Sequence, residues 1–254
     1  MVRAVILVAI VGVSTASGAS ATTPRKVPLT VSVTGSGVVH ITGGRQITCK
    51  VSCQQTFRVR AGSRVVVRPA PTTGWKFTAW AGACKGSAPT CTVRPRRASS
   101  VGVTFVPPGA RENPYAIGQT GPLGNNWNLR VNSVTPNAND QVVAYHDPGG
   151  FENKPPPPGA QDFMAQVTLT YTGGGSSNAF DNALDRLQAE GSHNAPYAYY
   201  SCGVPPAPNF ESVSGDLFSG QSITGNVCFQ VAVNDVDSLL AYVDAVKPVW
   251  FALR

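Results

Sequence analysis

Apolar and polar residues alternate in short runs along most of the chain from residue 28 onward. Leu29, Val31 and Val33 alternate with polar neighbours, and the same pattern recurs over 57–60. Successive side chains of a strand point to opposite faces, so this period of two predicts half-buried strands. Further strands are expected at 38–41, 65–67, 75–80, 91–93 and 101–105. No sustained helical period interrupts them, so the pattern predicts an all-β unit.

The second half of the chain also consists of short apolar runs separated by turn residues. Strands are expected at 127–134, 141–145, 163–171, 197–202, 227–233 and 250–253. This spacing is typical of a β-sandwich. The segment Ala179–Glu190 is either a helix ended by Gly191 or an edge strand, and we favour the strand. The run Pro155–Pro158 is extended and favours a stiff loop over a ligand for a proline-binding partner.

The stretch 74–91 contains two tryptophans and two cysteines. Its alternation predicts a strand over 75–80 with Trp75 on one face and Trp80 on the other. The following Gly, Ser and Pro residues predict a surface turn closed by Cys84 and Cys91. The two tryptophans are either core residues or platforms on which sugars or bases stack. We expect Trp80 to lie beneath the turn.

Residues 1–21 have the pattern of a secretory signal peptide. Arg3 is followed by an apolar segment, 4–13, and by Ala19-Ser20-Ala21, which fits a cleavage site. The apolar segment is short for a bilayer span, so cleavage is favoured over anchoring. We therefore expect a secreted or cell-envelope protein with no membrane span after cleavage.

The six cysteines fall into three local groups. In an exported chain an even number of cysteines favours disulfides over metal ligation. The grouping favours the pairs Cys49–Cys53, Cys84–Cys91 and Cys202–Cys228, although other pairings stay open at this point. A zinc site at Cys49 and Cys53 would need two further ligands at a suitable spacing, and Cys84 and Cys91 do not provide it. No metal and no cofactor are expected.

Charge divides the chain into two unequal halves. Residues 22–111 contain 14 Lys or Arg and no Asp or Glu, whereas residues 112–254 contain 5 Lys or Arg and 13 acidic residues. The sign changes just after Pro107-Pro108-Gly109, so we expect a domain at 28–106, a linker at 107–112 and a second domain at 113–254. Such asymmetry indicates either an anionic partner or attraction between the two halves.

The arginines of the first half are the candidate binding residues. They are Arg58, Arg60, Arg64, Arg68, Arg94, Arg96 and Arg97. The even spacing of the first four predicts one shared face, with the other three forming a cluster beside Cys91. Guanidinium groups bind phosphate and carboxylate in a bidentate manner, which fits teichoic or other wall polymers, acidic lipids or extracellular nucleic acid. The alternative is a solvated arginine face that only protects a sheet edge from aggregation.

Catalytic and calcium-binding patterns are weak. His40, His146 and His193 lie in separate contexts, and the neighbours His146 and Asp147 point apart on an extended segment. Asp235 and Asp237 alternate as calcium ligands can, but the Gly and Glu of an EF-hand loop are missing, which favours a solvated turn. We expect a non-enzymatic protein, with an unrecognised extracellular hydrolase as an alternative.

Several motifs of the first half resemble a known module. They include Gly35-Ser36-Gly37, Cys49-x-x-x-Cys53, Gly74-Trp75-x-Phe77 and Val101-Gly102-Val103-Thr104-Phe105. Over residues 28–106 the chain resembles the divergent bacterial internalin-type B-repeat. The resemblance implies a small, disulfide-stapled, β-rich (grasp-like) module of surface and secreted proteins, without catalytic residues.

Other motifs run through the second half. They include Asn113-Pro114-Tyr115-x-x-Gly118, Trp127-x-Leu129-x-Val131, Cys202-Gly203-Val204 and Gly225-Asn226-Val227-Cys228-Phe229. Over residues 113–254 the chain resembles the immunoglobulin-like, telokin-like domain of unknown function of secreted actinobacterial proteins. The resemblance implies an immunoglobulin-like β-sandwich with a Cys202–Cys228 disulfide. It also implies that the protein is located in the cell envelope or outside the cell.

These observations together predict a secreted, two-domain, all-β binding or adhesion protein of the bacterial envelope. The basic domain is expected to contact an anionic cell-wall polymer or acidic surface, while the second domain faces a protein partner. The structural alternative is a spacer whose basic and acidic domains dock on each other.

Overall fold

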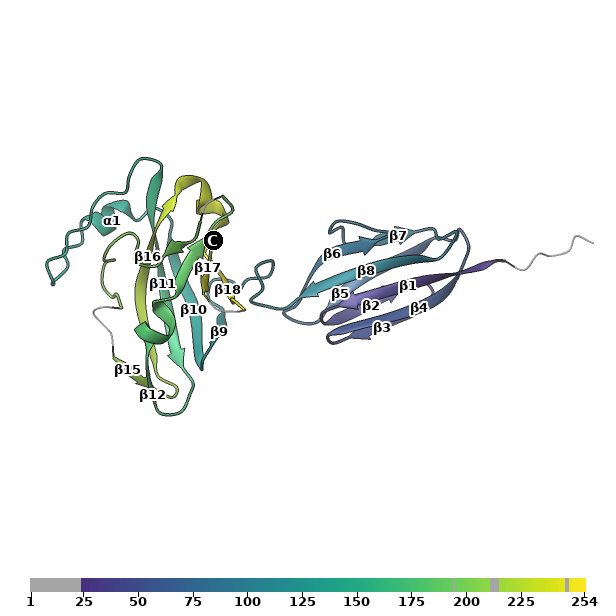
Figure 1. Cartoon of the computed structure of the whole chain (residues 1–254), viewed down its shortest axis with the longest axis horizontal. Helices are drawn as coiled ribbons and strands as arrows, with labels where there is room; N and C mark the ends of the chain where they lie inside the picture. The colour runs from purple at the N-terminus through teal and green to yellow at the C-terminus, as the bar shows by residue number, and fades with distance from the viewer. Residues whose placement is uncertain (1–23, 194, 211–214, 245–246) are drawn as a thin grey trace, which may run out of the picture.

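The computed structural model describes residues 24–193, 195–210, 215–244 and 247–254, so the expected signal peptide at 1–21 lies outside them. Figure 1 shows two strand-rich bodies joined by one connecting segment. Each body encloses its own large hydrophobic cluster, one formed by buried residues between Val27 and Phe105 and the other by buried residues between Trp127 and Leu253. The predicted all-β class is confirmed.

Residues 24–106, the N-terminal unit, form two four-stranded sheets. The first sheet has the order β4 (Ser52–Arg60), β1 (Lys26–Thr34), β8 (Ser99–Val106) and β6 (Lys76–Gly82). The second has the order β3 (Arg45–Cys49), β2 (Gly37–Ile41), β5 (Val65–Pro71) and β7 (Cys91–Val93). All neighbours are antiparallel except β1 and β8, which run parallel.

The alternation seen in the sequence places one face of each sheet in the core. Along β1, Leu29, Val31 and Val33 are buried while their neighbours are half-buried or exposed. Inward side chains from both sheets join one cluster, so the sheets face each other. Residues 24–106 contain no helix, and a two-layer sandwich therefore describes this unit better than the grasp-like arrangement implied by the resemblance.

Residues 113–254, the C-terminal unit, form a second and larger sandwich. One sheet has the order β16 (Ser222–Ala232), β11 (Ala160–Tyr171), β10 (Trp127–Thr135) and β9 (Thr120–Gly124). The other has the order β14 (Tyr197–Ala198), β13 (Leu187–Glu190), β17 (Leu240–Val243) and β18 (Trp250–Ala252). A small sheet pairs β12 (Ser176–Asn178) with β15 (Asp216–Phe218). Three short helices complete the described part: α1 (Asn139–Val143), a π-helix (Phe180–Leu184) and a 3-10 helix (Val233–Ser238).

One expected strand, at 141–145, is instead the helix α1, so that prediction is wrong. Ala138 and Val142 are four residues apart and fully buried, and they pack with Met164 and the Cys202–Cys228 disulfide. One helical turn places both side chains next to each other on one side, whereas in a strand residues four apart share a face but lie about 13 Å apart.

Both readings of Ala179–Glu190 are present in succession. A single π-helical turn covers Phe180–Leu184, and β13 then begins at Leu187.

Three disulfides join the pairs favoured by the cysteine grouping: Cys49–Cys53, Cys84–Cys91 and Cys202–Cys228. Disulfides of this kind persist in oxidising environments. The described residues contain no helix long and apolar enough to cross a membrane.

The connection between the units is attached to the C-terminal one. The Trp250 N–H donates to the Gly109 carbonyl at 2.9 Å, and the Tyr115 N–H donates to the Trp250 carbonyl at 2.9 Å. Arg111 lies with its guanidinium carbon 4.6 Å from the Trp250 ring centre and pairs with Glu190 at 2.7 Å. Most of the expected linker at 107–112 is therefore held against β18.

Candidate functional site

Seven arginines and one lysine lie at one end of the N-terminal unit, and we call this group the basic tip. Its members, all exposed, are Arg25, Lys26, Arg58, Arg60, Arg64, Arg94, Arg96 and Arg97. Six of the seven arginines predicted from the sequence belong to it, and only Arg68 lies elsewhere. Arg25 and Lys26 were not singled out, because nothing in their local pattern connects them with residues 58–64.

Strand direction brings these residues together. The antiparallel register of β1 and β4 places Lys26 opposite Arg60, so β1 begins where β4 ends. β5 begins and β7 ends at the same place, because Val65 is opposite Val93, with Arg64 and Arg94 as the adjoining residues. The Gly62 N–H donates to the Pro95 carbonyl at 2.6 Å, which joins the loop after β4 to the loop after β7.

The basic tip lies at the end of the unit opposite the linker. β8 runs parallel to β1, with Ser99 beside Leu29, so it begins near the tip and ends at Val106. Val106 leads directly into the linker, and Figure 1 shows the start of β1 on the side away from the C-terminal body. The surface of the tip is therefore not covered by the other unit.

The expectation that Arg58, Arg60, Arg64 and Arg68 share a face is wrong. β4 and β5 belong to different sheets, and residues 61–64 carry the chain from one to the other. Arg58 and Arg60 point away from the core on the first sheet, whereas Arg68 is exposed on the second sheet, opposite His40 in the register. Arg68 is thus outside the basic tip.

The basic tip has no carboxylate to neutralise it within its own unit, because residues 22–111 contain no Asp or Glu. The ion pairs of the described residues are Arg111–Glu190, Arg186–Asp185 and His193–Asp235, and none includes a member of the tip. Arg94, Arg96 and Arg97 line an open depression of about 540 Å³ beside Pro95. The tip is therefore a positively charged surface without a neutralising partner among these ion pairs.

The tryptophans do not form a binding platform at this end. Trp80 is only 4% exposed, and its indole N–H donates to the Ala88 carbonyl at 2.6 Å, beneath the turn closed by Cys84 and Cys91. Trp75 is half-buried and packs against the same core. The core interpretation of Trp80 is therefore the right one.

Among the described residues, the histidines do not form a Ser-His-Asp triad. His146 and Asp147 do not bond to each other: His146 Nδ1 contacts the Ala144 carbonyl at 2.9 Å, and the Gly149 N–H donates to Asp147 at 2.8 Å. Ser192, His193 and Asp235 do meet, a grouping that the sequence does not reveal. However, Ser192 Oγ (2.9 Å) and Asp235 Oδ1 (3.1 Å) both contact the same ring nitrogen, Nδ1. A triad needs the two contacts on opposite nitrogens.

Asp235 is fully buried, which corrects the expectation of a solvated turn. Its carboxylate accepts hydrogen bonds from the His193 N–H and the Tyr197 hydroxyl, each at 2.8 Å. These bonds tie the 3-10 helix to the segment after β13. Within the described ranges, no group of three or more His, Cys, Asp or Glu side chains is placed to hold a metal ion.

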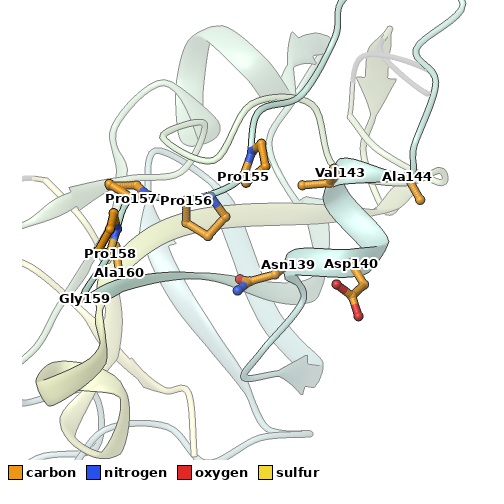
Figure 2. A pocket seen from close by; sticks show the side chains of 10 residues that line it. All are labelled: Asn139, Asp140, Val143, Ala144, Pro155, Pro156, Pro157, Pro158, Gly159 and Ala160. Carbon is orange, nitrogen blue, oxygen red and sulfur yellow. The ribbon is translucent and has the colours of Figure 1, made fainter.

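A groove of about 550 Å³ lies between α1 and the proline run 155–158 (Figure 2). Figure 2 shows the prolines along one side and the helix on the other, with Asp140 pointing away from the prolines. The other polar side chain, Asn139, already accepts a hydrogen bond from the Asp162 N–H at 2.7 Å. Ligand sites need a few converging polar groups. This groove therefore fits the stiff-loop interpretation of the proline run.

No protein-family model matches the chain, and no curated protein matches it. Among solved structures, the chain is similar to the yjhA protein from Bacillus subtilis, with 18% identity, a TM-score of 0.34, and 51% of this chain and 81% of that chain covered. It is also similar to a conserved hypothetical protein from Bacillus anthracis, with 12% identity, a TM-score of 0.34, and 54% and 95% of the two chains covered. These are distant similarities of β-rich structure to bacterial proteins over about half of the chain.

Proposed function

We propose that this protein is a secreted, non-enzymatic component of the bacterial cell envelope that binds an anionic wall polymer through its basic tip. The observation that carries the proposal is the convergence of eight exposed cations at one end of a unit whose sequence contains no acid.

The spacing of the cations suits a polymer with repeated phosphate groups. Alternate residues of a strand, such as Arg58 and Arg60, are about 7 Å apart and point the same way. Arg64 and Arg94 extend the positive surface across the end of the second sheet. Each guanidinium presents a planar fork of donors that matches a phosphate oxygen pair, so successive anionic groups can be bound at once.

The outer face of the first sheet provides uncharged polar groups next to the tip. Thr30 and Thr56 contact each other at 3.0 Å across β1 and β4, and Ser32 donates to Gln54 at 3.2 Å. These side chains continue along the same two strands as Lys26, Arg58 and Arg60. A sugar-phosphate chain that starts at the tip would meet hydroxyl and amide groups along this face.

Export and envelope placement fit this function. The signal-like residues 1–21 and the three disulfides both suit a protein of an oxidising compartment. The resemblances to the internalin-type B-repeat and to the telokin-like domain support placement on a bacterial surface. Because the tip lies opposite the linker, polymer binding would leave the C-terminal unit free to face a partner.

The test compares binding of the full chain to purified bacterial cell walls and to inorganic polyphosphate at increasing salt. If about five cations contact the polymer, counterion release predicts a fall in affinity of about 100-fold between 50 and 200 mM salt. Dextran, a neutral polymer, should show no binding. Equal binding at low and high salt would contradict the electrostatic mechanism.

Charge-matched variants locate the site. Arg60→Gln, Arg96→Gln and Arg97→Gln together remove three charges from the tip, and we expect a loss of affinity of at least about tenfold. The control combines Lys50→Gln, Lys154→Gln and Arg254→Gln, which removes the same charge from exposed positions elsewhere. Equal losses in both variants would show that only net charge matters, and no binding by the wild type would favour the spacer alternative.

A further inference from the structure

Four aromatic residues gather on the C-terminal unit, away from the basic tip: Phe151, Phe180, Tyr199 and Tyr200. Phe151 is 53% exposed, Phe180 44% and Tyr200 63%, which is unusual for large aromatic side chains. Together with Asp185, Gly203 and Val204 they line an open cleft of about 500 Å³, which we call the aromatic cleft.

Two pairs of neighbouring rings in the aromatic cleft stand at steep angles to each other. Phe180 and Tyr199 have ring centres 6.3 Å apart and an angle of 77°, and Tyr199 and Tyr200 are 5.2 Å apart at 86°. The cleft thus has aromatic walls in more than one plane, in contrast to a flat stack.

The backbone holds this shape in place. Phe180 begins the π-helical turn, which the Asp185 N–H closes by donating to the Phe180 carbonyl at 3.1 Å. Gly203 has a φ of 98°, and a Cβ there would lie 2.2 Å from Asn153 Oδ1 and 3.2 Å from the Phe151 ring. A side chain at this position would displace Asn153 and crowd the Phe151 ring, so glycine keeps both close to this side of the cleft. The preceding residue, Cys202, is fixed by its disulfide to Cys228.

Asp185 is the charged residue that lines the cleft, and no Lys or Arg among the described residues lines it. Arg186 Nε lies 3.9 Å from Asp185 Oδ1, but the Asp185 side chain is still 43% exposed. The surrounding sequence, 112–254, contains 13 acidic and 5 basic residues, so a cation is attracted to this unit as a whole.

We propose that the aromatic cleft binds a quaternary ammonium group. Aromatic faces carry negative charge density and attract cations, and rings in several planes can surround a trimethylammonium group. A primary ammonium such as that of lysine holds its water strongly, which disfavours it in an open cleft. The Asp185 carboxylate distinguishes this site from a surface that only buries apolar groups.

The test titrates the full chain with choline chloride at constant ionic strength and follows side-chain shifts by NMR. The comparison ligands are 3,3-dimethylbutan-1-ol, which has the shape of choline without the charge, and methylammonium. We expect choline to bind about three- to tenfold more tightly than either. Equal binding of choline and the neutral alcohol would overturn the proposal, as would the absence of choline binding.

Variants connect binding with the cleft. Tyr200→Ala and Phe180→Ala should each weaken choline binding about three- to tenfold, while Phe218→Ala removes an exposed aromatic outside the cleft and should leave it unchanged. Asp185→Asn keeps the size of the side chain and should weaken choline but not the neutral alcohol. Unchanged choline affinity in all three cleft variants would overturn the assignment, even if the protein binds choline elsewhere.

Discussion

Two fully buried aspartates of the C-terminal unit have opposite environments. Asp235 accepts hydrogen bonds from a backbone N–H and from the Tyr197 hydroxyl, so its carboxylate is well supported. Neither side-chain oxygen of Asp162 has a hydrogen-bond partner within the described residues. Burial raises the pKa of Asp162, and the nearby Gln230 side chain opposes part of the rise without making a well-formed hydrogen bond. A buried carboxylate without partners is costly in its charged form.

Asp162 therefore makes the stability of the protein depend on pH. Because its pKa is raised in the folded state, folded protein binds more protons than unfolded protein at pH values between the ordinary pKa of 3.8 and the raised pKa. The free energy of unfolding then falls as the pH rises through the raised pKa. Asp162→Asn removes this penalty, and we expect the advantage of the variant over the wild type to grow with pH and to reach about 1–3 kcal/mol above the raised pKa.

Denaturant unfolding at several pH values measures this difference. Asp237→Asn is the control, because it makes the same substitution at an exposed aspartate of the same unit. A constant difference between Asp162→Asn and the wild type at all pH values would contradict the assignment.

At the level of elements, β6 shows why a correct strand prediction can assign the wrong faces. Strict alternation places Phe77 and Trp80 on opposite faces. The register shifts between Phe77 and Ala79, so an extra residue at Thr78 reverses the alternation. Phe77 and Trp80 consequently lie on the same side, with ring centres 4.9 Å apart. Such a β-bulge depends on the partner strand and has no local signal in this sequence.

The alternation of apolar and polar residues correctly predicted the regular strands that bury one face, such as β1, β10 and β11. It failed at α1, because this helix packs Ala138 and Val142 against Met164 and a disulfide, which come from later in the chain. The basic tip could be predicted from the sequence even less, because its residues come from segments far apart in the chain. The arginines could be identified, but their convergence follows from strand order and direction, which place Lys26 beside Arg60 and Arg64 beside Arg94.

The disulfides close loops of different length, so their removal should destabilise the protein to different extents. Cys202 and Cys228 are 26 residues apart, and Cys84 and Cys91 are 7 apart. From loop entropy, replacing the first pair with alanine should lower the free energy of unfolding by about 3.5 kcal/mol, against about 2.5 kcal/mol for the second. The first pair is also buried beneath α1, which adds a packing loss.

Hydrogen exchange of the full chain at increasing denaturant measures the two effects separately, because the disulfides lie in different units. The reverse order would show that loop length does not determine their contributions. The Cys49–Cys53 pair closes the shortest loop, with a separation of 4 residues, so its removal should lower the free energy of unfolding least.

In the whole molecule, one short segment joins the two units and is bonded to both. Gly109 is hydrogen-bonded to Trp250, and Arg111 is bound to both Trp250 and Glu190. The N-terminal unit reaches the same segment through Lys76, which donates to the Glu112 carbonyl at 2.8 Å, and through Gly74, whose carbonyl accepts from Asn113 at 2.8 Å. Pro107 and Pro108, whose backbone φ is restricted, form the remaining connection.

Arg111 combines a stacked guanidinium with a partly buried ion pair, so it should limit motion between the units more than an exposed pair does. We expect Arg111→Ala to release the linker from β18 and to increase the radius of gyration in small-angle X-ray scattering. Arg111→Lys keeps the charge but loses the planar contact, and its effect should be intermediate. Arg186→Ala is the control, since Arg186 lies 3.9 Å from its exposed partner Asp185.

The salt dependence of the same measurement separates linker attachment from attraction between the oppositely charged halves. If stacking on Trp250 holds the linker, the wild type should keep its radius of gyration at high salt, because stacking is screened less than charge attraction. If the basic and acidic halves instead attract each other directly, high salt should expand the wild type and Arg111→Ala alike. Identical scattering from the wild type and Arg111→Ala at every salt concentration would exclude a role for Arg111 in orienting the units.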